Sequence, residues 1–483
     1  MRIKFFLILI IFSILTLQVS AEIIRISSFE ELNKIGKHPD FPLDGNYELT
    51  QDIDASESRN MNDGQGFKPI GEFRSALSFD YMFTGTFDGK GFVIKDLYIN
   101  RPTENFVGLF GVVRNGEIKS FGFEDASIVG NDRVGALVGY MNSSIIIDCF
   151  STITASYFTG SVSGGTGDQI GGLVGGIRGG GVSNSYFVGD VSGANETVGG
   201  LVGYSENVTI TNCYSKGNVY GNIVAGGLMG RILGSQVTNC YSTASVSGER
   251  RLGGLVGRVD SESNSQATRS SITNCYSTGS VSGTGDNVGG LIGELNGRGT
   301  ITNSYSAGLV SGKGNNIGGF IGSDGGWEMF LTVTNCFWDI ETSKQTTTAI
   351  GGTGLLTAEM KQQVFYTGWD FNTIWQIEED HSYPYLSSLG KPVSVIGSKT
   401  TRNTPVTSMP LITVKNKTLN VKTVSNSDLQ IRLFDMRGKT LVRFNTRGSG
   451  SNSFSLAKIP AGRYLIETRE NRKRVEVSAV IIR

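Results

Sequence analysis

The most regular feature of the chain is a short apolar block that returns throughout its middle part. Most blocks contain glycine, a small residue, leucine, an aliphatic residue and a closing glycine, as in Gly199-Gly200-Leu201-Val202-Gly203. The closing glycines are Gly111, Gly139, Gly175, Gly203, Gly230, Gly257, Gly293 and Gly322. Their spacing is about 28 residues, with two longer units, and a fixed period of this size indicates a repeat architecture.

A second signature follows most blocks and alternates between small and larger residues. In the segment from Cys275 to Val281, alternation places Cys275, Ser277 and Val281 on one face of a strand and Tyr276 on the other. The first set is small and ends in valine, so we expect it to point inward. One unit therefore holds two short strands and two turns, and no helix.

Such a unit cannot bury its apolar side chains alone. Stacking units at about 4.8 Å pairs the backbones and builds a continuous core. The sequence therefore predicts an all-β fold, a parallel β-helix in which like residues lie above like. Glycine is expected at the sharp corners because it accepts a positive φ.

The five cysteines occupy one repeated position and none forms a C-x-x-C pair. They are Cys149, Cys213, Cys240, Cys275 and Cys336. Ser185 and Ser304 replace cysteine in two units, which weakens the case for a disulfide framework. We therefore expect buried thiols that behave as small hydrophobic residues, with structural disulfides as the alternative.

The next residue of each unit is aromatic and is expected to form an outer row. The row contains Phe150, Tyr186, Tyr214, Tyr241, Tyr276, Tyr305 and Phe337. Exposed rings can stack against sugar faces, so the ligand-binding residues predicted from the sequence are Tyr186, Tyr214, Tyr241, Tyr276 and Tyr305. Two alternatives remain open, since this row could face inward or be covered by a loop.

The N-terminal segments suggest export. Residues 1–21 have a basic start, an apolar run and a small-residue cleavage site, as in a secretory signal peptide. The mature chain is expected to begin near Glu22, to have no membrane span and to be secreted or at the cell surface. Residues 22–106 are predicted to form an N-terminal cap and the first coils. Ser28 to Glu31 is a capping-box pattern that opens a short helix ending at Gly36.

The C-terminal segments divide into three parts. Residues 341–390 are predicted to cap the solenoid, with a short helix over 357–364 and an aromatic cluster interpreted as an end cap rather than a sugar platform. That cluster contains Trp369, Phe371, Trp375 and Tyr385. Residues 391–410 resemble a linker, and the alternating strands of residues 411–483 predict a small antiparallel β-sandwich.

Two resemblances accompany these patterns. The glycine blocks paired with Asn-Cys-Tyr-Ser over residues 107–340 resemble the GLUG repeats of exported bacterial proteins. That resemblance implies a β-helical surface or adhesin-like stalk, and no known catalytic residue. The segments Leu433 to Lys439 and Ile459 to Leu465 resemble the immunoglobulin-like C-terminal sorting domains of type IX secretion cargo. That resemblance implies contact between residues 411–483 and secretion machinery.

Charge is consistent with separate roles for the two regions. The whole chain has 43 basic and 43 acidic side chains, whereas residues 411–483 contain 15 Lys and Arg against 5 Asp and Glu. A basic module can bind nucleic acid. Because this charge is spread along strands of an exported chain, we expect a solvated face or a secretion contact and no nucleic-acid partner.

Candidate catalytic chemistry is sparse. The two histidines, His38 and His381, lie outside the repeats, and no G-x-S-x-G or P-loop motif occurs. The segment from Gly164 to Asp168 approaches a calcium repeat but lacks one residue, so a corner turn is favoured. We therefore predict no catalytic residue, no metal site and no cofactor.

Three functions remain after this search. The favoured hypothesis is a non-catalytic display or adhesion protein that binds glycans or another surface through the flank of the β-helix. A β-helical polysaccharide lyase or hydrolase is the second, and a purely structural envelope component is the third. The oligomeric state and the identity of the ligand are left open.

Overall fold

The computed structural model describes two compact units, Met1–Pro384 and Tyr385–Arg483. The described residues are 22–75, 79–142, 152–154, 157–165, 169–194, 197–261, 269–326, 331–392, 411–415, 418–423, 429–435, 440–446, 450–460, 462–470 and 473–482. The predicted signal peptide, Cys149, Phe150 and most of the predicted linker lie outside them. Within the described part, no helix is long and apolar enough to cross a membrane.

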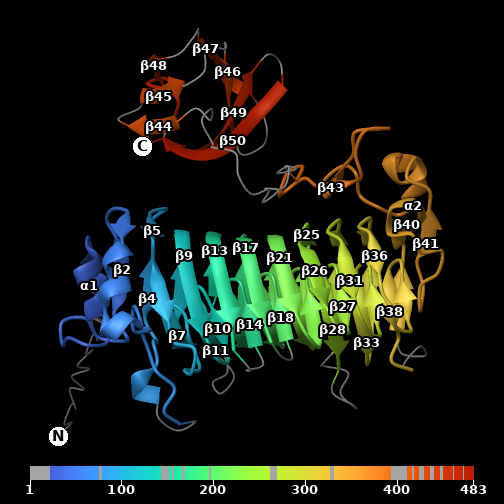
Figure 1. Ribbon diagram of the computed structural model, residues 1–483, viewed down its shortest axis with the longest axis horizontal. Helices are drawn as coiled ribbons and strands as arrows, with labels where there is room; N and C mark the ends of the chain where they lie inside the picture. The colour runs from blue at the N-terminus through green and yellow to red at the C-terminus, as the bar shows by residue number, and fades with distance from the viewer. Residues whose placement is uncertain are drawn as a thin grey trace, which may run out of the picture. The chain divides into compact units, whose positions relative to one another are not determined.

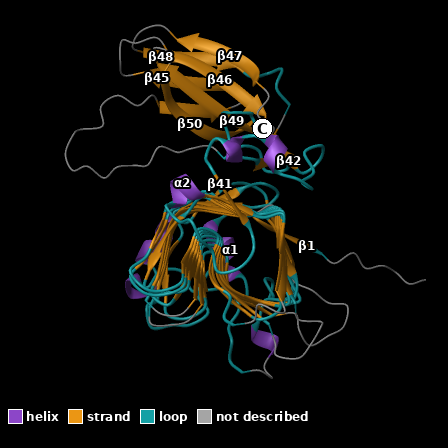
Figure 2. Cartoon of the chain, turned by 90° about the vertical axis from the view of Figure 1, so that its right-hand side faces the viewer, coloured by secondary structure: helices purple, strands orange, loops and turns teal. Residues whose placement is uncertain are grey.

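The first unit is a solenoid of four parallel sheets, which we call A to D (Figure 1). A single coil passes from sheet D to sheet C, then to sheet A and sheet B, and Figure 2 shows these walls around a common interior. Buried apolar side chains fill that interior. This arrangement confirms the all-β, parallel solenoid predicted from the repeat.

The strands of each sheet follow one another coil by coil. Sheet D contains β10 (Val134–Gly135), β14 (Gln169–Gly171), β18 (Thr197–Gly199), β22 (Val224–Gly226), β27 (Leu252–Gly253), β32 (Val288–Gly289) and β37 (Ile317–Gly318). Sheet C contains β7 (Phe110–Arg114), β11 (Val138–Asn142), β15 (Val174–Arg178), β19 (Val202–Glu206), β23 (Met229–Leu233), β28 (Val256–Asp260), β33 (Ile292–Asn296) and β38 (Ile321–Ser323).

Sheets A and B complete each coil. Sheet A contains β1 (Ile23–Ile26), β2 (Asn46–Leu49), β4 (Thr86–Asp88), β8 (Glu117–Lys119), β12 (Thr152–Thr154), β16 (Gly181–Ser183), β20 (Thr209–Thr211), β24 (Gln236–Thr238), β29 (Ser270–Thr273), β34 (Gly299–Thr302) and β39 (Leu331–Thr334). Sheet B contains β3 (Ile53–Asp54), β5 (Val93–Lys95), β6 (Tyr98–Asn100), β9 (Gly122–Gly130), β13 (Tyr157–Gly164), β17 (Tyr186–Gly193), β21 (Tyr214–Gly221), β25 (Tyr241–Ser242), β26 (Ser245–Gly248), β30 (Tyr276–Ser277), β31 (Val281–Gly283), β35 (Tyr305–Ser306), β36 (Val310–Ser311), β40 (Phe337–Asp339) and β41 (Thr353–Leu355).

The block glycines turn the chain by a different mechanism from the one expected. Their backbones do not have a positive φ. Instead, they leave no room for a side chain, since a Cβ on Gly199 would lie 1.9 Å from the carbonyl oxygen of Val202. The prediction that corner glycines supply positive φ values is therefore confirmed at turn residues such as Gly179, Gly180 and Gly234, but it does not hold for the block glycines, where close backbone approach is the reason.

The positive φ values occur at the asparagines that precede the Cys-Tyr pairs. These residues are Asn184, Asn212, Asn239, Asn274, Asn303 and Asn335, with φ between 48° and 54°. Asparagine tolerates this conformation better than most residues. Their amides also bond from coil to coil, as in the 3.1 Å bond that Asn274 Nδ2 donates to Asn239 Oδ1.

The N-terminal end of the core is covered by α1 (Phe29–Lys34), which begins as predicted. Ser28 Oγ accepts a hydrogen bond from the Glu31 amide at 3.2 Å. Glu31 Oε2 returns to the amide of Ser27, at 2.7 Å, rather than to that of Ser28. Helix α1 buries Phe29 and Leu32 against the first coils, and Gly36 follows with a φ of 72°.

The other short elements lie in loops of this unit. They are η1 (Ser56–Asn60), η2 (Asn62–Gly64), η3 (Phe79–Tyr81), α2 (Ile340–Ser343), η6 (Glu359–Lys361), η7 (Gln363–Phe365) and β42 (Trp375–Gln376). The helix predicted over residues 357–364 is therefore wrong. Gln362 has an extended backbone between η6 and η7, so two 3₁₀ turns replace one helix.

The second unit begins with β43 (Tyr385–Leu386) and contains two antiparallel sheets. One contains β44 (Leu411–Lys415), β45 (Thr418–Thr423) and β48 (Gly450–Ser455), and the other contains β46 (Leu429–Asp435), β47 (Thr440–Thr446), β49 (Gly462–Glu470) and β50 (Lys473–Ile482). Leu419, Ile431 and Leu433 share one buried core. The antiparallel prediction is confirmed, whereas the immunoglobulin-like and sorting-domain assignments stay predictions.

Candidate binding face of the solenoid

The cysteine row points into the solenoid, as the alternation predicted. Cys213, Cys240, Cys275 and Cys336 are buried free thiols. The Cys213 thiol donates to the carbonyl of Thr211 at 3.2 Å, and burial raises the pKa of this thiol well above its usual value. The four cysteines therefore serve as small core residues, and Cys213 has little thiolate character.

The tyrosine row lies on the outer side of sheet B as one continuous stack. Successive ring centroids from Tyr186 through Tyr214, Tyr241 and Tyr276 to Tyr305 are 4.6, 4.9, 4.9 and 5.0 Å apart, with interplanar angles below 10°. The strand spacing imposes this separation. Neighbouring rings therefore occupy both faces of Tyr214, Tyr241 and Tyr276, and the expected stacking of sugars on those faces is wrong. What remains for a ligand is the ring edges and hydroxyls.

The far end of this stack is covered by residues 356–384, which we call the strap. Tyr241 is 5% exposed, and Tyr276 and Tyr305 are each 1% exposed. Trp375 lies 6.0 Å from the Tyr276 ring, and the Tyr305 hydroxyl donates to the carbonyl of Pro384 at 2.7 Å. The prediction that these three tyrosines are exposed is therefore wrong. At Tyr276 and Tyr305 the alternative of a covering loop is confirmed.

The strap also corrects the position of the predicted aromatic end cap. Trp369 and Trp375 are 4.3 Å apart and pack on the flank of the solenoid, over the tyrosine stack, rather than across its end. At the end itself, Trp338 belongs to the core cluster, with Ile340 and Ile350 packed against it. Tyr385 belongs to the second unit.

Asp339 anchors the strap at the last coil. Its side chain is fully buried and accepts four hydrogen bonds. Two come from the amides of Glu341 and Thr342 at 2.8 and 2.9 Å, and two from the hydroxyls of Thr357 and Tyr383 at 2.7 Å each. A buried carboxylate with this many donors ties the strap, α2 and β40 together.

At the other end of the tyrosine stack, on β17 and β21, the rings are not covered by the strap. Tyr186 and Tyr214 are half-buried, and Lys216, Asn218 and Tyr220 follow Tyr214 at alternate outward positions of β21. At about 3.3 Å per residue, this row extends about 20 Å from Tyr214 to Tyr220. Tyr220 is 51% exposed, the largest exposed fraction among the described tyrosines.

Polar groups lie beside Tyr220. Asp190 of β17 is the register partner of Asn218, and its Oδ1 accepts from the Asn218 amide nitrogen at 3.2 Å and from Asn218 Nδ2 at 2.8 Å. Both residues are exposed. Partial burial lowers the pKa of Lys216. An aromatic ring, an amide, a carboxylate and an ammonium group thus share one outward face.

Comparison with known proteins bears on the repeat. The family model described as the GLUG motif matches residues 194–220 and 248–282. Both matched stretches lie within the repeat region of the solenoid. The first includes almost all of β21, whereas β17 lies just before it, so the match covers the β21 half of the candidate face.

Relatives match only part of this chain. Over 133 residues, or 27% of the chain, it is 36% identical to halomucin of Haloquadratum walsbyi. Over 106 residues, or 21%, it is 36% identical to a protein of Evansella cellulosilytica named as a Gly-rich membrane protein. The matched stretches span 1% and 11% of the lengths of these two relatives.

Solved structures resemble the chain weakly. A Bacteroides ovatus protein named for an immunoglobulin A1 protease has a TM-score of 0.35 and 19% identity, covering 75% of this chain and 92% of that one. A second structure, named IgA1 Protease, has a TM-score of 0.43 and 16% identity, covering 72% and 24%.

The repeat pattern did not indicate Tyr220, because that pattern consists of residues that recur from unit to unit. The neighbouring coils carry serine at the positions that flank Tyr220 in the sheet, Ser192 on one side and Ser247 on the other. Tyr220 is thus a large aromatic residue in an outward row of serines. A search for departures from the repeat at outward positions would have found it.

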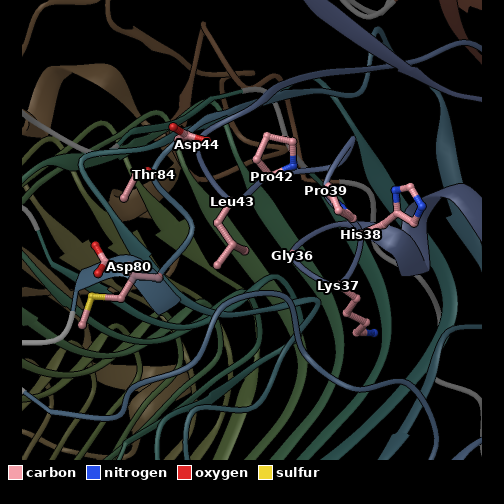
Figure 3. A pocket seen from close by; sticks show the side chains of 10 residues that line it. Gly36, Lys37, His38, Pro39, Pro42, Leu43, Asp44, Asp80 and Thr84 are labelled. Atoms are coloured by element: carbon pink, nitrogen blue, oxygen red, sulfur yellow. The ribbon is translucent and has the colours of Figure 1, made fainter.

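The two histidines lie at surface turns, as predicted. His38 Nδ1 accepts from the amide of Asp40 at 3.3 Å, and His381 Nδ1 lies 2.7 Å from the carbonyl oxygen of Glu379. His38 lines a cavity of about 680 Å³ at the N-terminal end. Figure 3 shows Asp80 on the opposite side of this cavity from His38 and Lys37, so these groups do not converge on one point. Among the described residues, no group of three His, Cys, Asp or Glu side chains is placed to hold a metal ion.

Proposed function

We propose that this chain is a surface-associated, non-catalytic display protein that binds an oligosaccharide through the outer face of β17 and β21. The observation that carries the proposal is the half-exposed ring of Tyr220 beside the Asp190–Asn218 pair. Aromatic rings stack against the apolar faces of sugars, while amides and carboxylates bond to their hydroxyls. The hydroxyls of Tyr186 and Tyr214 extend the polar surface along the solenoid.

The shape of this face favours an extended ligand. Its groups occupy a row about 20 Å long on a flat sheet, rather than a closed pocket. Flat, exposed rows suit a chain of sugars that lies along the surface. The stacked rings and paired strands beneath hold the row rigid, which lowers the entropic cost of binding.

Surface association has independent support. The relatives are named halomucin and a Gly-rich membrane protein. Together with the signal peptide predicted over residues 1–21, these names favour export to the cell surface. Under this proposal, residues 411–483 contact the secretion machinery, and the solenoid carries no catalytic residue.

Binding to a glycan array tests this function. We expect the purified chain to bind a subset of glycans, and Tyr220→Ser to abolish that binding. Serine is the residue found on both neighbouring strands at this position, so Tyr220→Ser should leave the fold intact. Tyr241→Phe, a change at a buried ring of the same stack, is the matched control and should bind like the unmodified chain. Silence of the array, equal loss in both variants, or the release of sugar products from the bound glycans would contradict the proposal.

A further inference from the structure

The C-terminal cap closes the sheets of the solenoid unequally. In sheets C and D, residues 347–349 bond to the last strands, with the Gly319 amide donating to Thr347 at 2.8 Å and the Ala349 amide donating to Ile321 at 3.0 Å. In sheet B, β41 pairs with β40. Sheet A receives no such strand, since among the described residues β39 pairs only with β34.

The opposite end of sheet A is open in the same way. Strand β1 pairs with β2 on one side, and no described strand lies on its other side. Strands β1 and β39 are both four residues long and belong to one parallel sheet. An edge strand presents unpaired amides and carbonyls that can bond to another chain.

The inward column of sheet A shows that the two edges share one register. It runs from Ile24 through Tyr47 and Phe87 on to Ile301 and Val333. The described side chains between the two ends are at most 3% exposed, whereas Ile24 and Val333 are only partly buried. Ile350 and Gly351 of the cap lie near Val333, but they form no backbone hydrogen bond with β39 among the described residues.

We propose that β39 of one chain pairs with β1 of a second copy, so that sheet A continues from one solenoid into the next. Only a strand with the same direction continues a parallel sheet, and β1 has that direction. In the register that continues the column, Val333 meets Ile24 and Thr334 meets Arg25. The contact is head-to-tail, so repeated pairing builds an open chain of solenoids rather than a closed dimer.

A charge placed at the edge tests this pairing. Sedimentation velocity of the full chain should show species that grow with protein concentration. Thr334→Arg places a second arginine opposite Arg25 across the junction, where like charges oppose pairing, and should return the protein to monomer. Thr302→Arg makes the same change in the same outward row one strand further in, and should leave association intact.

A charge reversal separates pairing from misfolding. Combining Arg25→Glu with Thr334→Arg places opposite charges across the junction and should restore association. A chain that stays monomeric at every concentration overturns the proposal. So does a Thr334→Arg variant that still associates, or a loss of association that is equal in Thr302→Arg.

Discussion

Two adjacent rings of the tyrosine stack differ in the hydrogen bonding of their hydroxyl groups. Tyr276 and Tyr305 are 5.0 Å apart, and each is 1% exposed. The Tyr305 hydroxyl donates to the buried Pro384 carbonyl, whereas the Tyr276 hydroxyl is buried without a described partner. The same substitution to phenylalanine should therefore have opposite effects at the two positions.

The magnitudes follow from the hydrogen bonds. Tyr305→Phe removes one bond and leaves the Pro384 carbonyl unpaired, which should lower the free energy of unfolding by about 1–3 kcal/mol. Tyr276→Phe removes a hydroxyl that is desolvated without compensation, so it should be neutral or raise that free energy by up to about 1 kcal/mol. Both changes keep the ring and its packing.

Urea denaturation followed by tryptophan fluorescence measures both variants, because Trp369 and Trp375 lie over these rings. The reasoning predicts a gap of about 1–4 kcal/mol between the two variants, with Tyr305→Phe the less stable. Equal destabilisation of both would show that the Tyr276 hydroxyl has a partner, and the account of the strap would then fail.

Three further predictions concern the anchor, the glycine corners and the buried tyrosines. Asp339→Ala removes a buried acceptor of four hydrogen bonds and should lower the free energy of unfolding in urea by about 3–5 kcal/mol. The control Glu379→Ala removes an exposed carboxylate of the strap and should cost under about 0.5 kcal/mol. Similar values for the two variants would refute the anchoring role of Asp339. Gly226→Ala places a Cβ 1.9 Å from the carbonyl oxygen of Met229 and should prevent folding or lower the melting temperature sharply. In the control Gly299→Ala, the nearest atom to the new Cβ is 3.1 Å away, so the melting temperature should fall far less. A melting temperature unchanged by Gly226→Ala would count against the corner geometry. Burial raises the pKa of Tyr276 and Tyr305 well above the unfolded value near 10, so the stability that they contribute is complete below pH 10 and is lost as pH rises further. Absorbance at 295 nm should therefore show exposed tyrosines ionising first and the buried ones only with unfolding, and a single titration near pH 10 would disprove their burial.

The repeat allowed much of the solenoid to be predicted, because each position is sampled several times. Alternation from Cys275 to Val281 was enough to orient the cysteines inward and the tyrosines outward. The role of the glycines was not predictable, since the sequence does not tell a positive φ from a close backbone approach. Asn212 took the positive φ instead.

The binding face was harder to predict because two of its determinants lie outside the repeat pattern. The strap covers Tyr276 and Tyr305 through contacts distant in sequence, such as that between Tyr305 and Pro384. Ring stacking then occupies the faces that a single exposed tyrosine would offer. Tyr220 stands out only when the repeats are aligned and the outward serines are compared.

Hydrogen–deuterium exchange with a glycan identified on the array tests the central claim most directly. The account predicts slower exchange in β17 and β21 on binding, over residues 186–193 and 214–221, with β30 and β35 under the strap unchanged. Protection confined to sheet C or to the N-terminal cavity, with none in β21, would contradict it.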